Sequence, residues 1–194
     1  MTVGILGGTF DPPHLGHVAL ARTALAALPL ERLLVVPLNV APHKAVETDA
    51  ETRLLLAEAA FAREPGVEVS RQELDRAGPS YTVDTARWAA ETYGDAIFLV
   101  GADEFAGFLS WREPDTILEL ARIAVATRPG SDPERLAAVR DGLARPERVL
   151  ELPFEPLEVS SSDIRARVAR GEPIDGLVPD AVARLVAELG LYRG

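Results

Sequence analysis

The sequence contains no cysteine, which excludes disulfide bonds and cysteine-ligated metal sites and permits a reducing compartment. Long apolar stretches are also lacking, since no run approaches the ~18 residues that a membrane span needs. The N-terminus has no basic segment of the kind that opens a signal peptide. We therefore expect a cytoplasmic protein that has no membrane partner.

Positive charge is scarce as well. The formal net charge is -10, and Lys44 is the only lysine beside nineteen arginines. A nucleic-acid partner requires cations clustered on one face, so the composition disfavours such a partner. A small anionic ligand needs only a few cations placed locally, and this class of ligand stays open.

Residue types that are chemically labile at high temperature are also scarce. Met1, Asn39 and Gln72 are the only residues of their types, beside fifteen prolines. Such depletion is typical of heat-stable proteins. A coding bias toward alanine, arginine and proline produces the same composition, so both interpretations stay open at this point.

The length of 194 residues, 47% of them hydrophobic, suffices for one well-buried domain and is short for two. We predict a single domain over residues 1–194, with a helical C-terminal portion from about residue 160. Apolar runs predict strands at 2–7, 33–37, 67–70, 96–100, 123–127 and 148–152. Helical patterns lie at 13–28, 50–63, 82–93, 133–143, 161–170 and 179–189. This alternation predicts an α/β fold, a Rossmann-like open parallel sheet with helices on both faces.

The stretch ILGGTFDPPHLGH, residues 5–17, joins the first strand to the first helix. The glycine pair after the strand lets backbone amides approach a ligand closely, and the proline pair suits a helix start. His14 and His17 then fall in or near the first turn on one face, where free backbone amides favour an anion. Neither a P-loop nor G-x-G-x-x-G is present. The pattern predicts an anion site, most simply for phosphate.

Two alternatives explain the same histidines. One is a structural cap together with a surface residue. The other is a zinc site in which His43 joins His14 and His17, since imidazole is a common zinc ligand. We prefer the anion site, because the glycines, prolines and histidines occur together and the histidine spacing is not the usual i,i+4 pair.

Three other residues stand out for their chemistry. Arg165 follows a predicted helix start at 160–163, where Ser160 suits a cap for the amide of Asp163, and it is placed to reach back toward that start. A guanidinium there grips phosphate oxygens. Lys44 is a compact point charge in an arginine-rich chain, on a loop after the second strand. Trp111 is by default a core residue.

Six short segments follow GGTFDPPHLGH in order: NVAPHK at 39–44, PSYT at 79–82, GAD at 101–103, SW at 110–111, RPG at 128–130 and VSSSDIR at 159–165. Together they resemble the nucleotidyltransferase superfamily that carries the (H/T)-x-G-H signature, and within it the nicotinate-nucleotide adenylyltransferase family. The resemblance implies that superfamily's version of the Rossmann-like sheet. It also implies adenylyl transfer from ATP to nicotinate mononucleotide, with magnesium carried by ATP.

The resemblance also implies roles for particular residues. Those implied in catalysis are His14, His17, Lys44 and Arg165. Those implied in contact with ATP are Gly7, Gly8, Thr9, Phe10, Gly101, Asp103, Ser161 and Ser162. Those implied at the nicotinate ring and its carboxylate are Thr82, Trp111 and Arg112, of which Arg112 departs from the aromatic residue common in the family.

Two other functions remain to be weighed. One is a sister adenylyl- or cytidylyltransferase, such as pantetheine-phosphate adenylyltransferase, against which PSYT and Trp111 argue. The other is a nucleotide-binding sensor without turnover, against which the retained histidines, Lys44 and Arg165 argue. The sequence carries no sign of the oligomeric state.

Overall fold

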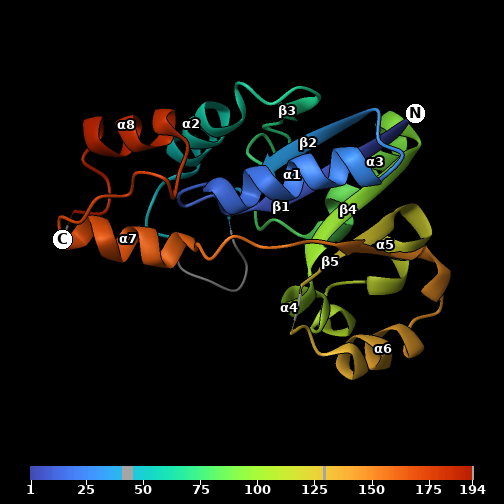
Figure 1. The fold of residues 1–194 in the computed structure, drawn as a ribbon. Coiled ribbons are helices and arrows are strands. Elements are labelled where there is room, and N and C mark those ends of the chain that lie inside the picture. The colour runs from blue at the N-terminus through green and yellow to red at the C-terminus, as the bar shows by residue number, and fades with distance from the viewer. Residues whose placement is uncertain (41–45, 129, 194) are drawn as a thin grey trace.

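The computed structural model describes residues 1–40, 46–128 and 130–193. Within these residues six strands form one parallel sheet in the order β3-β2-β1-β4-β5-β6. Figure 1 shows the sheet between the helices. The strands are β1 (Thr2–Gly8), β2 (Arg32–Pro37), β3 (Val67–Val69), β4 (Asp95–Gly101), β5 (Arg122–Thr127) and β6 (Val149–Pro153). The predicted α/β class and the parallel sheet are confirmed.

The strands are apolar almost throughout because both faces of the sheet are covered. Successive residues point to opposite sides, so that Ile5 packs into one core and Leu6 into the other. Leu34 and Val35 of the neighbouring strand divide in the same way. The continuous apolar runs in the sequence therefore reflect two cores, one on each face.

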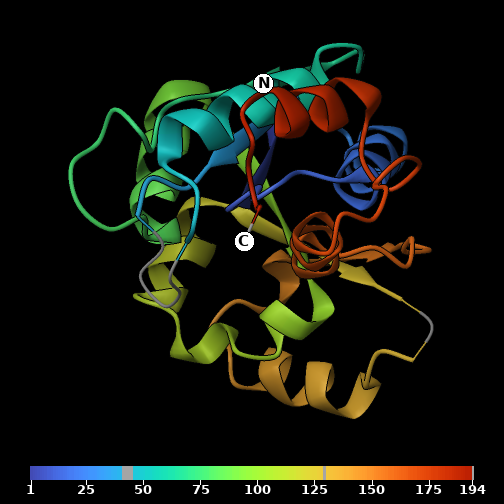
Figure 2. The same cartoon turned by 90° about the vertical axis from the view of Figure 1, so that its left-hand side faces the viewer.

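Among the described residues, four helices cover each face of the sheet, and Figures 1 and 2 show the two layers. One layer holds α1 (Leu15–Ala27), α2 (Ala50–Phe61), α7 (Ser161–Ala169) and α8 (Asp180–Glu188). The other layer holds α3 (Thr82–Tyr93), α4 (Ala102–Phe105), α5 (Pro114–Leu120) and α6 (Pro133–Asp141). The last helix, α8, lies beside α2, so the C-terminal portion packs near the first half of the chain.

The sequence patterns missed the elements between residues 102 and 121. The structure has α4, a 3-10 helix at Phe108–Ser110 and α5 there, and a second 3-10 helix at Pro146–Arg148. Each spans seven residues or fewer, which is too short for a helical period to emerge. The first helix also begins later than predicted, at Leu15, because His14 is its extended N-cap residue.

The strand order reverses direction between β1 and β4, which pair side by side. In open parallel sheets this switch point leaves a crevice beyond the carboxyl ends of the strands, where ligands bind. Those ends are Gly8 in β1 and Gly101 in β4. Within the part of the chain that the structure describes, no helix has the length and apolar character to cross a membrane.

Candidate functional site

A cavity of about 390 Å³ opens at this switch point. Its walls include the ends of β1, β2 and β4, the start of α3 and the turn after Phe108–Ser110. Six residues that the sequence singled out line it together: Gly7, Gly8, Thr9, Thr82, Trp111 and Arg112. Residues more than one hundred positions apart in the chain thus meet around one space.

The two glycines of β1 serve different purposes. A Cβ at Gly8 would lie 3.0 Å from Cζ of Phe10, so this glycine makes room for the Phe10 ring. A Cβ at Gly7 would meet no atom within 4 Å and would stand in the cavity. Phe10 itself has a φ of 51° and is 1% exposed, so its ring belongs to the core and a ligand reaches only its backbone.

His14 and His17 form a stacked pair at the start of α1, with ring centroids 3.7 Å apart. The backbone N–H of His14 donates to Nδ1 of His17 at 3.1 Å. A neutral imidazole has one donor and one acceptor nitrogen, so the proton of His17 lies on Nε2. The predicted placement of both histidines on one face is confirmed.

Burial decides the charge of this pair. It lowers the pKa of His14 to about 4 and that of His17 to about 3, where the neighbouring His14 adds to the effect. Both rings are therefore neutral at pH 7, and neither supplies a positive charge. A Cβ at Gly16 would lie 3.0 Å from Nδ1 of His14. Glycine at this position therefore leaves room for the His14 ring.

The start of α7 lies against residues 9–15, which we call the histidine loop. These residues connect β1 to α1 and include Leu15, the first residue of that helix. Ser161 Oγ donates to the carbonyl of Pro12 at 2.8 Å, and Arg165 Nη1 donates to the carbonyl of Asp11 at 2.8 Å. Nε of Arg165 also lies 3.5 Å from Glu47. Helix α7 thus brings its N-terminus and a guanidinium beside the histidine pair.

The first turns of α7 follow the predicted pattern. The hydroxyl of Ser160 accepts from the N–H of Asp163 at 3.1 Å, which is the expected cap. Ser162 is exposed in the first turn, and its neighbour Ser161 is half-buried. The free backbone amides of this turn form the positive end of the helix dipole, which favours a nearby anion.

Where Thr82 and Arg112 line the cavity, Trp111 packs against the core and lines the open space as well. Its ring packs 5.1 Å from that of Phe108 and borders the open space. The Arg112 guanidinium lies 4.7 Å from the ring centroid of Tyr81, and its Nε is 3.7 Å from Glu113. Thr82, the first residue of α3, stands next to Tyr81, so an alcohol, a helix N-terminus and a cation share this part of the cavity.

Eight predicted residues that the structure describes do not line the cavity: Phe10, His14, His17, Gly101, Asp103, Ser161, Ser162 and Arg165. Gly101 caps α4, and Asp103 is 81% exposed and forms an ion pair with Arg128 at 2.9 Å. Lys44 lies outside the described residues, and so does His43, which the zinc hypothesis requires. Among residues 1–40, 46–128 and 130–193, no group of three or more His, Asp or Glu side chains is arranged to hold a metal ion.

Glu73 is a cavity residue that the sequence patterns missed. It is 4% exposed and accepts a hydrogen bond from the Thr85 hydroxyl of α3 at 2.5 Å. Burial raises its pKa. Glu73 lies in the polar segment before PSYT, where it resembles a solvent-exposed acid in the sequence. Its closeness to that motif was the only sequence signal for a place in the cavity.

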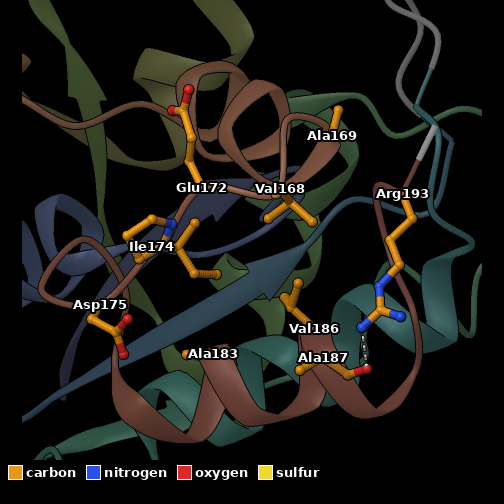
Figure 3. A pocket seen from close by; sticks show the side chains of 11 residues that line it. Val168, Ala169, Glu172, Ile174, Asp175, Ala183, Val186, Ala187 and Arg193 are labelled. Carbon is orange, nitrogen blue, oxygen red and sulfur yellow. Dashed lines mark hydrogen bonds between the residues drawn. The ribbon is translucent and has the colours of Figure 1, made fainter.

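A second hollow, of about 580 Å³, lies between α7 and α8. Figure 3 shows Val168, Ile174 and Val186 facing it, with Arg193 at its edge. Of the singled-out residues that the structure describes, none lines this hollow.

Comparison with known proteins places the chain among the nucleotidyltransferases. Residues 5–167 match the family described as cytidylyltransferase-like. A protein of Bordetella avium described as a probable nicotinate-nucleotide adenylyltransferase is 42% identical over 98% of both chains. A Roseiflexus protein with the same description is 43% identical, again over 98% of both chains.

A solved structure supports the fold. The Plasmodium falciparum nicotinic acid mononucleotide adenylyltransferase in complex with NaAD superposes with a TM-score of 0.77 at 16% identity, over 98% of this chain and 97% of that one. Sheet, cavity and relatives agree: the chain belongs to the cytidylyltransferase-like family and, within it, to the nicotinate-nucleotide adenylyltransferases.

Proposed function

We propose residue roles for the reaction of this family, in which ATP and nicotinate mononucleotide give nicotinate adenine dinucleotide and pyrophosphate, a step of NAD synthesis. A phosphate oxygen of the mononucleotide attacks the α-phosphorus of ATP. The bond from that phosphorus to the bridging oxygen breaks, and its electron pair leaves with pyrophosphate. No protein nucleophile is required, so positioning and charge stabilisation account for catalysis.

One observation carries the proposal: a single cavity joins the glycine end of β1 to Thr82 and Trp111. The glycine end offers backbone amides for the nucleotide, and the other end offers a platform and donors for the pyridine ring. An ATP bound at the histidine loop and a mononucleotide bound at Trp111 would bring their phosphates together between the two ends.

Four side chains would stabilise the transferred phosphoryl group. His17 would donate through Nε2–H, which its bond to the His14 backbone leaves protonated, and His14 would donate beside it. Arg165 would exchange its 3.5 Å contact with Glu47 for phosphate oxygens. Lys44 would supply a further positive charge, and the cations matter because both histidines are neutral.

The nucleotide would be held mainly by backbone and small polar groups. Gly7, Gly8, Thr9 and Phe10 offer main-chain contacts at the end of β1. The N-terminus of α7, with Ser161 and Ser162, favours the negative triphosphate. Gly101 ends β4 and Asp103 follows it at the same edge of the sheet, where an exposed carboxylate suits the nucleotide or a metal-bound water.

Magnesium would arrive with ATP, bound by triphosphate oxygens, and would neutralise charge on the leaving pyrophosphate. The exposed Asp103 carboxylate is of the chemical type that holds a water on magnesium. Its present partner, Arg128, lies 2.9 Å away and would turn to the phosphates. The role of this chain is then to orient the triphosphate with its ion.

The nicotinate ring would stack on Trp111, and its carboxylate would accept from Thr82 and nearby amides of α3. Nicotinamide carries a neutral amide that both donates and accepts, so the same donors fit it only in part. A site built for one hydrogen-bonding pattern leaves polar groups unpaired with the wrong ligand. Arg112, which lines this end, adds a cation that favours the acid.

The test is kcat/KM for both mononucleotides with ATP. We expect the acid to be preferred by ~10² to 10⁴. Trp111→Ala should cost about 1 to 3 kcal/mol with either substrate, because stacking is common to both, and should leave the ratio unchanged. Arg112→Ala should lower the ratio selectively, while Arg135→Ala on the exposed face of α6 serves as a control. Equal values for the two mononucleotides, or a preference for the amide, would contradict the proposed site.

Other features remain predictions. We treat residues 1–194 as one nucleotidyltransferase domain whose C-terminal helical portion begins at about residue 160. The cytoplasmic location expected from the composition also stays a prediction.

A further inference from the structure

A buried arginine of α2 forms a hydrogen bond with the histidine loop. Arg53 is 2% exposed and donates to the carbonyl of Thr9 at 2.9 Å. Within the described residues it also donates to the carbonyls of Asn39 and Thr48, at 2.9 and 3.1 Å. One guanidinium therefore ties the histidine loop to the segment that follows β2.

Further polar contacts between the loop and the described part of the chain come from the C-terminal portion. Besides Ser161 and Arg165 of α7, the carbonyl of Leu177 accepts from the N–H of Leu15 at 3.0 Å. These residues add no strand to the sheet, yet they contact Asp11, Pro12 and Leu15. The C-terminal portion thus acts as a support for the loop that carries His14.

The last of these contacts joins Asp11 to Tyr192, 181 residues later in the chain. The Asp11 side chain is buried, and its Oδ1 accepts from the Tyr192 hydroxyl at 2.7 Å. Burial raises the pKa of the Tyr192 phenol, so the hydroxyl keeps its proton and remains a donor. A hydrogen bond to a carboxylate is stronger than one between neutral groups, especially away from water.

Tyr192 is itself held in place. Its neighbour Arg193 donates to the carbonyl of Ala187 in α8 at 3.1 Å, as Figure 3 shows. The backbone N–H of Leu191 donates to the carbonyl of Val186 at 3.0 Å. The segment after α8 is thus fastened to that helix, and its tyrosine reaches back to the histidine loop.

We propose that Tyr192 is a positioning residue for adenylyl transfer, which acts through Asp11 on the histidine loop and makes the C-terminal segment a support of the ATP site. The inference rests on the proposed function, because it takes this loop as the binding place of the triphosphate. Catalytic donors must be held within a fraction of an ångström, and residues behind them supply that constraint. Loss of the hydroxyl frees Asp11, three residues before His14.

Tyr192→Phe removes the hydroxyl and keeps the ring. We expect kcat to fall about 10-fold and KM for ATP to rise severalfold, since misplaced donors cost rate, while KM for nicotinate mononucleotide changes less than twofold. A purely structural role would reduce the amount of active enzyme, which lowers apparent kcat and leaves both KM values unchanged. A kcat and a KM for ATP within twofold of the parent would overturn the proposal.

Tyr93→Phe at the far end of α3 is the matched control, because Tyr93 packs against Trp88 away from the cavity. The imidazole nitrogen signals of His14 and His17 in NMR spectra should shift in Tyr192→Phe and not in this control. Unshifted signals would count against the proposal independently of activity.

Two further variants complete the test. Asp11→Asn keeps an acceptor at the same place with a weaker bond, and should give a smaller change of the same kind even if Tyr192→Phe folds poorly. Fully additive effects of the two substitutions would contradict an action of Tyr192 through Asp11. His17→Asn, measured alongside, tests the proposed function: if it lowers kcat and Tyr192→Phe does not, only the further inference fails.

Discussion

Replacement of His17 tests the proposed chemistry most directly. If Nε2–H of His17 stabilises charge on the transferred phosphoryl group, His17→Ala removes one preorganised donor. Such a loss typically lowers kcat by ~10² to 10³, or about 2.7 to 4 kcal/mol of transition-state stabilisation. KM values should change far less, because the interaction strengthens only as charge develops.

The same substitution also disturbs the fold locally. The His17 ring accepts the N–H of His14 at 3.1 Å and packs edge-on against Phe10, with centroids 5.0 Å apart. Loss of the helix-start contact alone costs about 0.5 to 2 kcal/mol of stability. To attribute a lower kcat of His17→Ala to the lost donor, a second variant is needed that keeps the contact with the His14 backbone.

Two amide variants separate the roles of the two ring nitrogens. In His17→Asn the Oδ1 atom takes the place of Nδ1 and accepts from His14, but no donor reaches the ε position. In His17→Gln a donor reaches that position and the acceptor is lost. We expect His17→Asn to match His17→Ala in kcat and exceed it in stability, and His17→Gln to keep more activity.

The assay is the rate of pyrophosphate release at saturating ATP and nicotinate mononucleotide, with circular dichroism and thermal melting of each variant. A folded His17→Asn or His17→Ala protein with kcat within about threefold of the parent would refute the assignment, because removal of a preorganised donor should cost at least ~10². A kcat for His17→Gln below that of His17→Asn would contradict the role given to Nε2.

Two further predictions concern stability. Burial lowers the pKa of His14 to about 4 and that of His17 to about 3, so the unfolded chain binds protons more tightly than the folded chain. The two neutral histidines therefore contribute to the free energy of unfolding, and this contribution is fully present above pH ~6.5. It falls as the pH drops toward 4, by up to about 1.4 kcal/mol per pH unit for each histidine. The free energy of unfolding in urea should differ less between pH 7 and pH 5 for His17→Asn than for the parent. An equal difference in the two proteins would refute the pH dependence assigned to His17. The scarcity of labile residues predicts a Tm above the mesophile range of roughly 45 to 65 °C, and calorimetry that places it inside that range would favour coding bias.

Local features of the sequence sufficed for the sheet and for part of the site. A run such as AIFLV at 96–100 becomes a strand because it is apolar at every position, and the observed strand extends it by one residue at each end. The Pro-Pro-His segment predicted a helix start, and His14 and His17 lie on one face because their spacing dictates it. Ser160 caps the amide that it was expected to cap.

Contacts between distant segments decided the rest. Arg53 looks like a surface residue of an amphipathic helix, and it is buried because three backbone carbonyls from two loops converge on it. Glu73 becomes a cavity residue in the same way, through Thr85 of a helix that follows it. The partners of Arg53 and Glu73 meet them only when the chain has folded, so no local sequence pattern predicts these contacts.

The sequence by itself therefore determined the strands, most helices and the family, since each depends on short segments whose apolar period or motif is local. The tertiary structure alone decided that Tyr192 meets Asp11 across 181 residues, and that the histidines are neutral. Both follow from burial, because exclusion of water strengthens a hydrogen bond to a carboxylate and disfavours a charged imidazole. Burial is a property of the packed chain, which no single segment carries.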